Sequence, residues 1–95
     1  VSMGMNGALK TKQILENARG VLGIEMMAAA QALDFRTFAP GRGCLAAKAA
    51  VRERVAHLDE DRPLFPDHNA IAAAVETCEI LEAVEAEVGP LGTSW

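Results

Sequence analysis

Few side chains in this sequence combine a reactive type with surroundings that would support chemistry. Glu25 lies within the most apolar stretch of the chain, where a buried carboxylate could serve as a general acid or base. Buried carboxylates are more often paired with a cation, which here could be an arginine such as Arg36 or Arg52. We therefore expect Glu25 either to be paired with an arginine or to lie at a polar gap between helices.

The histidines and the acidic run lack the spacing of a metal site. His57 and His68 have no cysteine or second histidine at ligand spacing, whereas a metal site needs three or four converging ligands. The run Asp59-Glu60-Asp61 lacks the alternating ligands and the glycine of a calcium-binding loop. We expect a solvated acidic turn there, a surface position for His68, and no bound metal.

Phosphate binding and nucleophilic catalysis have equally little support. Four basic residues gather around a predicted helix start: Arg42, Lys48, Arg52 and Arg54. No glycine-rich phosphate loop surrounds them, so we expect ordinary surface charge. Cys44 has no histidine partner, and neither Ser2 nor Ser94 lies at a nucleophile elbow. The residues alone thus predict no catalytic, cofactor-binding or metal-binding site.

Composition and charge restrict the fold class and the partners. The 95 residues (10.1 kDa) are 51% hydrophobic but only 4% aromatic, with 18 alanines against seven valines and four isoleucines. Alanine and straight-chain residues favour helices, which excludes an all-β fold. The net charge of −4 and the pI near 5.0 argue against nucleic acid or an anionic membrane as a partner.

The sequence also bears on compartment and processing. No stretch of 18 apolar residues predicts a membrane span, and no secretory leader opens the chain. Cys44 and Cys78 are too sparse for a disulfide scaffold, so we expect reduced thiols in a cytoplasmic protein. Because the sequence starts at Val1, we expect either a removed leader or a piece of a longer chain.

One long helix is predicted over residues 1–34. Its main apolar stripe is spaced by three and four residues and comprises Leu15, Ala18, Leu22, Met26, Ala29 and Leu33. A second stripe beside it comprises Ile14, Val21 and Ala28. From Val21 to Leu33 the helix is apolar almost all round, so other helices must surround it.

Four glycines lie in this predicted helix: Gly4, Gly7, Gly20 and Gly23. Each glycine costs about 1 kcal/mol of helix stability relative to alanine. Glycines three residues apart also allow two helices to approach closely. The sequence leaves both interpretations open.

Residues 35–95 are predicted to form two or three shorter helices, at about 44–57, 68–76 and 77–88. Asp67 is the expected N-cap of the second of these and Thr77 of the third. Pro63 and Pro66 should keep the preceding loop extended, and Gly89 with Pro90 should end the last helix. The predicted fold is all-α, a single incomplete domain with a long central bundle helix (1–34) and a C-terminal helical segment (35–95).

The long helix is too long for a domain of this size. A helix of about 32 residues measures about 48 Å, whereas a compact globule of this length is about 32 Å across. We therefore expect about a third of the helix to overhang. Apolar surfaces of that size are normally interfaces, so the chain should pack against protein outside this sequence.

Several motifs occur in a distinctive order. They are Val1-Ser2-Met3-Gly4, Gln13-Ile14-Leu15-Glu16-Asn17, Val21-Leu22-Gly23-Ile24-Glu25, Ala28-Ala29-Ala30-Gln31-Ala32-Leu33-Asp34, Pro40-Gly41-Arg42-Gly43 and Asp61-Arg62-Pro63-Leu64-Phe65-Pro66-Asp67. Together they resemble the C-terminal segment of the aromatic amino-acid ammonia-lyases, and the histidine ammonia-lyase branch most closely. The resemblance covers about residues 1–92.

This resemblance implies an all-helical homotetramer in which long helices from four subunits form a central bundle. It also implies elimination of ammonia from L-histidine to give urocanate. The electrophile in this family is a methylidene-imidazolone made from an internal Ala-Ser-Gly, and tyrosines assist the reaction. This sequence has no Ala-Ser-Gly and no tyrosine, and the family's substrate-binding glutamate lies upstream of the Val-Ser-Met-Gly motif.

No catalytic residue of the family therefore carries over to this sequence. What carries over is structural, with Ile14 to Leu33 as a bundle helix and the later helices as its outer packing. Cys78 departs from the family by standing where a small turn residue is usual. The partners implied are the remainder of the lyase chain and other lyase subunits. The alternative is a free-standing helical interaction module, or a truncated paralogue that binds a lyase without catalysis.

Overall fold

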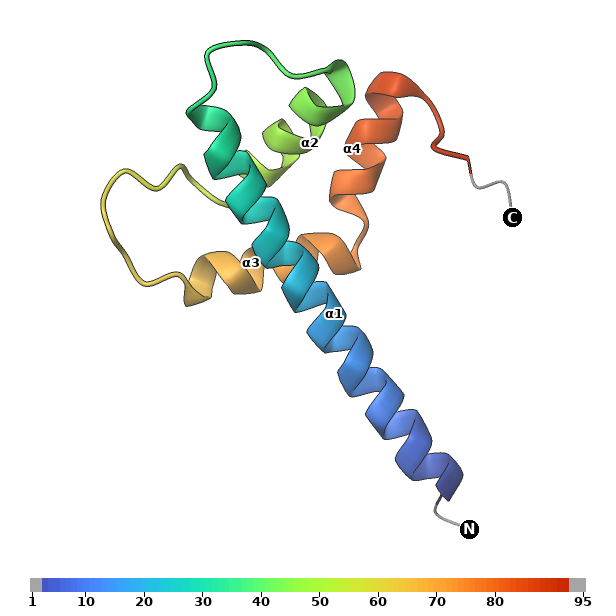
Figure 1. Cartoon of the computed structure of the whole chain (residues 1–95). Coiled ribbons are helices and arrows are strands. Elements are labelled where there is room, and N and C mark those ends of the chain that lie inside the picture. Colours follow the sequence, from blue (N-terminus) through green and yellow to red (C-terminus); the bar gives the residue numbers. More distant parts are fainter. Residues whose placement is uncertain (1–2, 93–95) are drawn as a thin grey trace.

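The computed structural model describes residues 3–92, which form four α-helices and no strand. The helices are α1 (Met3–Asp34), α2 (Arg42–Arg52), α3 (Phe65–Glu76) and α4 (Glu79–Val88). In Figure 1, α1 is a long rod, and the three shorter helices gather beside its C-terminal half. The all-α class and the long leading helix that ends at Asp34 are confirmed.

α2 begins two residues earlier and ends five residues earlier than the predicted 44–57 helix. Gly41, in an extended conformation, precedes its first turn. Beyond Arg52 the chain leaves the helix, although the Val55 N–H still donates to the Val51 carbonyl at 2.8 Å. The Arg52 guanidinium donates to the Val55 carbonyl at 3.1 Å, and a side chain thus satisfies an acceptor just past the helix end.

α3 begins at Phe65, three residues before the predicted start, so Asp67 is not its N-cap. Leu64 occupies the cap position and Pro66 lies in the first turn, where a missing N–H breaks no hydrogen bond. Pro66 therefore helps to start the helix and does not extend the loop. Asp67 also lies in the first turn, where its charge suits the helix dipole, and it accepts a hydrogen bond from Arg62.

The break between α3 and α4 is at Cys78 and not at Thr77. Thr77 ends α3, and its hydroxyl donates to the Ala73 carbonyl at 3.2 Å. Cys78 caps α4 in the left-handed conformation, with φ 61°. Gly89, with φ 87°, ends α4 as predicted.

α3 crosses α1 at two glycines. A Cβ on Gly23 would lie 2.9 Å from Cγ2 of Ile71, and one on Gly20 would lie 3.4 Å from Nε2 of His68. The two earlier glycines of α1 have no such neighbour within 4 Å. Of the two interpretations left open, close helix packing is confirmed for Gly23, whereas a Cβ on Gly20 would make an ordinary van der Waals contact with His68.

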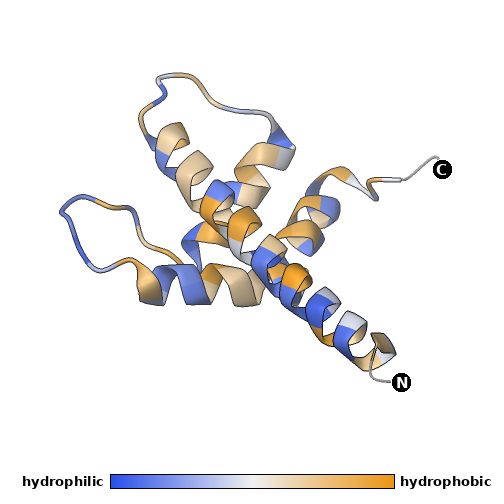
Figure 2. Ribbon diagram, turned by 60° about the horizontal axis from the view of Figure 1, so that its bottom comes forward, coloured by the Kyte–Doolittle hydropathy of each residue, from blue (hydrophilic) through white to orange (hydrophobic). Residues whose placement is uncertain are grey.

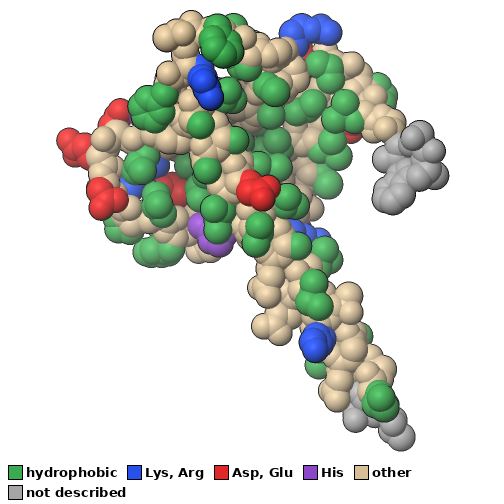
Figure 3. Space-filling model, viewed as in Figure 1, with side chains coloured by type: hydrophobic (Ala, Val, Ile, Leu, Met, Phe, Trp, Pro, Cys, Tyr) green, Lys and Arg blue, Asp and Glu red, His purple; other side chains and the backbone are tan. Residues whose placement is uncertain are grey.

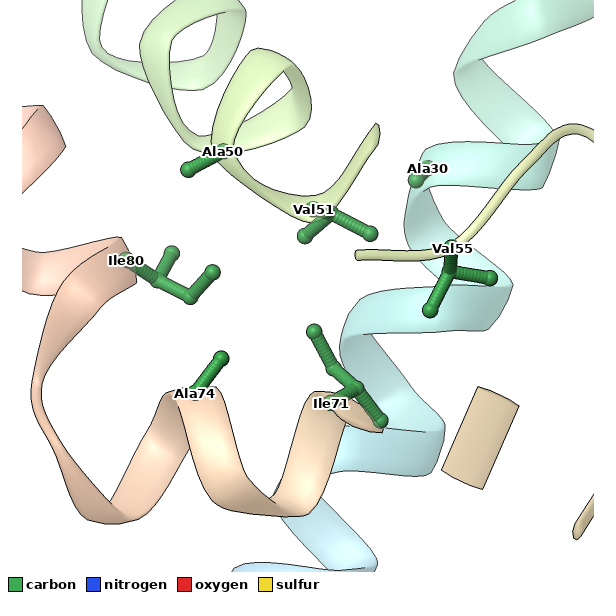
Figure 4. Packing of buried hydrophobic residues seen from close by; sticks show 7 residues of the cluster. All are labelled: Ala30, Ala50, Val51, Val55, Ile71, Ala74 and Ile80. Carbon is green, nitrogen blue, oxygen red and sulfur yellow. The ribbon is translucent and has the colours of Figure 1, made fainter. Parts of the chain in front are cut away.

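The core is small and lies where the four helices meet. Its seven buried residues are Ala30, Ala50, Val51, Val55, Ile71, Ala74 and Ile80. Figure 4 shows Ile71 and Ala74 pointing from α3 into the space between α1, α2 and α4. Ile71 is fully buried, with 0% of its surface exposed. Because most of these residues are small, the core buries little apolar surface per helix.

α1 buries only a narrow face, and the predicted apolar stripes remain largely open. All residues from Met3 to Ala18 are exposed; we call this part the overhang. In the other half, the buried residues are Gly23 and Ala30, and neither belongs to a predicted stripe. Figure 2 shows orange apolar positions along the whole of α1, and Figure 3 shows green side chains on the overhang.

The dimensions confirm that α1 extends beyond the rest of the molecule. The radius of gyration is 16.0 Å, against about 12 Å for a compact chain of this length. The accessible surface is 7060 Å², against about 5,300 Å² for a compact monomer of this mass. The exposed run from Met3 to Ala18 amounts to half of α1, although Glu16 near its end still lines a hollow against α3. Within residues 3–92, no helix is both long and apolar enough to cross a membrane.

Candidate functional site

The densest polar cluster surrounds Asp34, the last residue of α1. Nζ of Lys48 lies 2.6 Å from Oδ1 of Asp34, and the Arg52 guanidinium donates to Oδ2. Nδ1 of His57 contacts the same Oδ2 atom. The Asp34 side chain is only 17% exposed. These contacts fasten the end of α1 to α2 and to the segment of residues 53–64 between α2 and α3, which we call the strap.

The cluster keeps Asp34 ionised. Hydrogen bonds from Lys48 and His57, with a further contribution from Arg52, hold the pKa of the Asp34 carboxyl far below its usual value. Partial burial acts in the opposite direction but is outweighed. A carboxylate in the last turn of a helix is disfavoured by the helix dipole. The cations around Asp34 therefore offset both the burial and the dipole.

Two further contacts fasten the strap. The Gln31 side chain donates to the Leu58 carbonyl at 3.0 Å and accepts from the Leu58 N–H at 3.1 Å. Arg62 donates through Nε to Asp67 at 3.0 Å, and its other nitrogens donate to the carbonyls of residues 56–57 at 2.8 and 3.2 Å. The strap is therefore held to both α1 and α3 without any regular structure of its own.

A largely apolar cavity of about 220 Å³ lies between the strap and α1. Its apolar walls include Ile24, Met27, Ala28, Val55, Leu58 and Leu64. The polar residues on its wall (Gln31, Arg52, Arg62 and Asp67) all make the contacts described above. The arrangement therefore stabilises the packing of helices and strap, and its polar groups are already engaged with one another.

The predicted ion pair of Glu25 is wrong. Glu25 is exposed, and in the described part of the chain neither Arg36 nor Arg52 lies within ion-pair distance of it. Arg52 binds Asp34 instead, because α2 lies beside the last turn of α1. The general acid or base considered at Glu25 therefore lacks the burial that it would require.

The histidines differ in their surroundings. His68 was expected at the surface, but it is half-buried, and its Nε2 lies 3.1 Å from the Gly20 carbonyl. The reason is that α3 starts earlier than predicted and its first turns cross α1. His57 contacts Asp34 through Nδ1 and Asp59 through Nε2. Within residues 3–92, no three side chains of the metal-binding types converge on one point.

The four basic residues are all paired with carboxylates. Lys48 and Arg52 bind Asp34, while Arg54 binds Glu79 and Arg42 lies 4.0 Å from Glu87. The prediction of ordinary surface charge thus holds for the exposed Arg42 and Arg54, whereas the other two belong to the Asp34 cluster.

The remaining candidate nucleophiles add nothing to the cluster. Cys44 and Cys78 are both free and exposed. Ser2 and Ser94 lie outside the described residues.

Sequence reasoning missed Asp34 and Gln31. A signal for Asp34 was available, because a carboxylate in the last turn of a helix opposes the dipole and calls for cationic partners. Lys48 and Arg52, four residues apart on one helix face, are suited to that role. For Gln31 no comparable signal exists, since its partner is a backbone group of the strap.

Comparison with known proteins places the chain in a family. Residues 1–53 match the model of the family described as aromatic amino acid lyase. The chain is 51% identical over 85 residues to a histidine ammonia-lyase of Myxococcus xanthus, which covers 88% of this chain and 17% of that protein. It is 50% identical over 94 residues to a histidine ammonia-lyase of Symbiobacterium thermophilum, covering 96% of this chain and 18% of the relative.

A histidine ammonia-lyase of Sorangium cellulosum is 46% identical over 92 residues, covering 96% of this chain and 18% of the relative. The chain thus spans less than a fifth of the length of these curated relatives. No solved structure matches it significantly. Because the family model matches more than half of its residues, the chain belongs to the aromatic amino acid lyase family.

Proposed function

We propose that this chain is the C-terminal portion of a histidine ammonia-lyase, an enzyme that eliminates ammonia from L-histidine to give urocanate. The observation that carries the proposal is 50% identity over 96% of the chain to a protein named histidine ammonia-lyase. Because the chain spans only 18% of that relative, the activity belongs to a longer polypeptide or assembly.

In this proposal the chain supplies packing and the remaining polypeptide supplies catalytic groups. Its support is the uncovered apolar surface of α1, where Met3 is 83% exposed and every residue of the overhang is accessible. Apolar surface of this extent is normally covered by protein. We propose that the cover is the remainder of the lyase chain together with other subunits of a homotetramer, and that α1 joins the central bundle.

The residues of this chain do not fit the family electrophile. The methylidene-imidazolone requires an Ala-Ser-Gly, which these 95 residues lack, and they contain no tyrosine. The Asp34 cluster offers no substitute, since its groups are engaged with one another. We place the electrophile and the substrate-binding groups in the rest of the enzyme. We also place the enzyme in the cytoplasm, with no nucleic-acid or membrane partner.

Fragment complementation tests the proposal. A histidine ammonia-lyase lacking the segment that matches this chain is produced alone and together with the 95-residue chain, and urocanate formation from L-histidine is followed by ultraviolet absorbance. We expect neither part to be active alone and the co-purified pair to be active. Urocanate formation by the chain alone would contradict the assignment of catalysis to the rest of the enzyme.

The same experiment distinguishes the proposed function from the alternative, in which the chain is a helical interaction module. A chain that binds an intact lyase, yet never restores the shortened one, would be an interaction module and not a missing segment. Phenylalanine and tyrosine supplied as substrates to the active pair would test whether histidine is the preferred amino acid.

A further inference from the structure

The cavity between the strap and α1 has exposed apolar walls. Ile24 on α1 is 51% exposed, and Leu64 at the end of the strap is 46% exposed. Ala28 of α1 and Ala56 of the strap also line the cavity and are exposed. Phe65, directly after Leu64 in the sequence, is 70% exposed. A group from outside this chain can therefore reach the apolar walls.

The polar side chains on the wall already have hydrogen-bond partners. Gln31 exchanges two hydrogen bonds with the backbone of the strap, and Arg62 donates to Asp67. Arg52 donates to Asp34. A polar group that entered the cavity would give up hydrogen bonds to water and gain few in return, which is unfavourable. The walls therefore favour an apolar occupant.

The volume of the cavity limits the occupant to a single group. A cavity of about 150 Å³ with apolar walls holds a benzene molecule, and this one measures about 220 Å³. An α-helix, which is about 10 Å across with its side chains, is too large. The bonds of Gln31 and Arg62 fix the strap, so the cavity is already formed in the free chain. It suits one aromatic ring or one branched aliphatic side chain.

We propose that this cavity receives one apolar side chain from the part of the lyase polypeptide that lies outside this sequence. The inference rests on the proposed function, under which most of the enzyme is available as a partner, because the chain spans only 17–18% of its relatives. Protein interfaces commonly seat such an anchor in a pocket from which water is excluded. The cavity lies beside the C-terminal half of α1, so this contact is separate from the overhang.

Two substitutions that fill the cavity from different walls test the proposal. Ala28→Leu adds three carbons from α1, and Ala56→Leu adds three from the strap. Each should lower the affinity for the lyase that lacks the matching segment at least about tenfold, because the anchor side chain loses its place. The melting temperature of the free chain should not fall, since the added carbons bury apolar surface. If one variant melts earlier, the variant on the other wall decides.

Ala86→Leu is the matched control. Ala86 is exposed on α4, none of whose described residues lines the cavity, so this variant should bind normally. An equal loss of affinity in Ala86→Leu would overturn the proposal, because the effect would not depend on the cavity.

The remaining outcomes separate this inference from the proposed function. Normal binding by both filled variants, with activity restored by the unsubstituted chain, would overturn the inference and leave the proposed function intact. If the unsubstituted chain neither binds nor restores activity, the proposed function fails and the inference fails with it. Light scattering of the chain alone tests another occupant. If the unsubstituted chain is a dimer and both filled variants are monomers, a second copy fills the cavity and the proposal is wrong.

Discussion

Three donors converge on the two oxygens of Asp34, and they lower the pKa of this carboxyl relative to the unfolded chain. A group whose pKa is lowered by folding stabilises the native state above its unfolded pKa, and this contribution disappears as the pH falls toward the folded pKa. We therefore expect Asp34→Asn to lower the melting temperature at pH 7, because Lys48 and Arg52 lose their shared counter-charge.

The pH dependence distinguishes this effect from a loss of packing. The difference in melting temperature between Asp34→Asn and the unsubstituted chain should stay constant down to about pH 5 and shrink once the pH falls below the ordinary value of 3.8. Far-UV circular dichroism during heating measures it. Asp61→Asn, at an exposed carboxylate of the strap, should show no such difference. A deficit that stayed constant through the acid range would show that ionisation of Asp34 is irrelevant.

The backbone conformation of Cys78 destabilises the native state, and a substitution can measure by how much. Its φ of 61° places a side chain in the left-handed region, which is unfavourable by about 1–2 kcal/mol for residues other than glycine. Glycine loses more backbone entropy on folding, so Cys78→Gly should stabilise the chain by about 0.5–1 kcal/mol. Urea unfolding measures the change. Cys78→Ala keeps the Cβ and should give no gain; an equal gain in both would point to the thiol and not to the backbone.

The sequence indicated which kinds of contact a residue can make, but it did not indicate which residue would be the partner. The sequence offered Arg52 as one of two possible partners of Glu25 and otherwise as surface charge, whereas in the structure Arg52 donates to Asp34. Which carboxylate Arg52 reaches depends on where α2 crosses α1, and that crossing is fixed by packing at Ala30 and Val51. Local patterns carry no information about a distance set by another helix.

At the scale of the elements, the crossing of α1 and α3 depends on Gly23. A methyl group there would lie 2.9 Å from the fully buried Ile71, so the two helices would have to move apart. Overpacking of this kind costs about 1–3 kcal/mol, which is at least as large as the gain of about 1 kcal/mol in helix propensity. We therefore expect Gly23→Ala to lower the free energy of unfolding.

Gly7→Ala is the matched control, because nothing lies within 4 Å of its added Cβ. It should stabilise the helix by about 0.8–1 kcal/mol. Denaturant unfolding of both variants measures the two changes. If Gly23→Ala were also stabilising, the close approach of α3 to α1 would be wrong.

The helices themselves were predictable, but several of their ends were not. The 3.6-residue spacing in α1 gives the right element, and Gly89 gives the right end of α4. The start of α3 was placed three residues late because Pro66 was assigned to the loop, although proline fits a first helical turn. The face of α1 that is buried was also unexpected, since small residues such as Gly23 allow closer approach than the leucine stripe does.

At the scale of the whole molecule, the length of the predicted first helix indicated that the molecule would be elongated. A 32-residue helix cannot be covered by three helices of 10 to 12 residues, and half of α1 extends free. The exposed overhang follows from the length of the predicted helix, whereas the sequence does not specify the surface that we propose covers it. The family resemblance was needed to propose the rest of a lyase as that cover.

This cover can be tested at Ile14, which is 60% exposed on the overhang. Because the side chain touches little in the chain, Ile14→Glu should leave its helix content unchanged by circular dichroism. If the rest of a lyase buries Ile14, the substitution places an unpaired charge in an apolar interface. The affinity for the shortened lyase should then fall at least about tenfold, or about 1.4 kcal/mol, with a matching loss of restored activity at limiting concentrations.

Gln13→Glu adds the same charge one residue away on the polar side and should bind nearly normally. Equal binding by Ile14→Glu and the unsubstituted chain would mean that the overhang remains in solvent in the assembled enzyme.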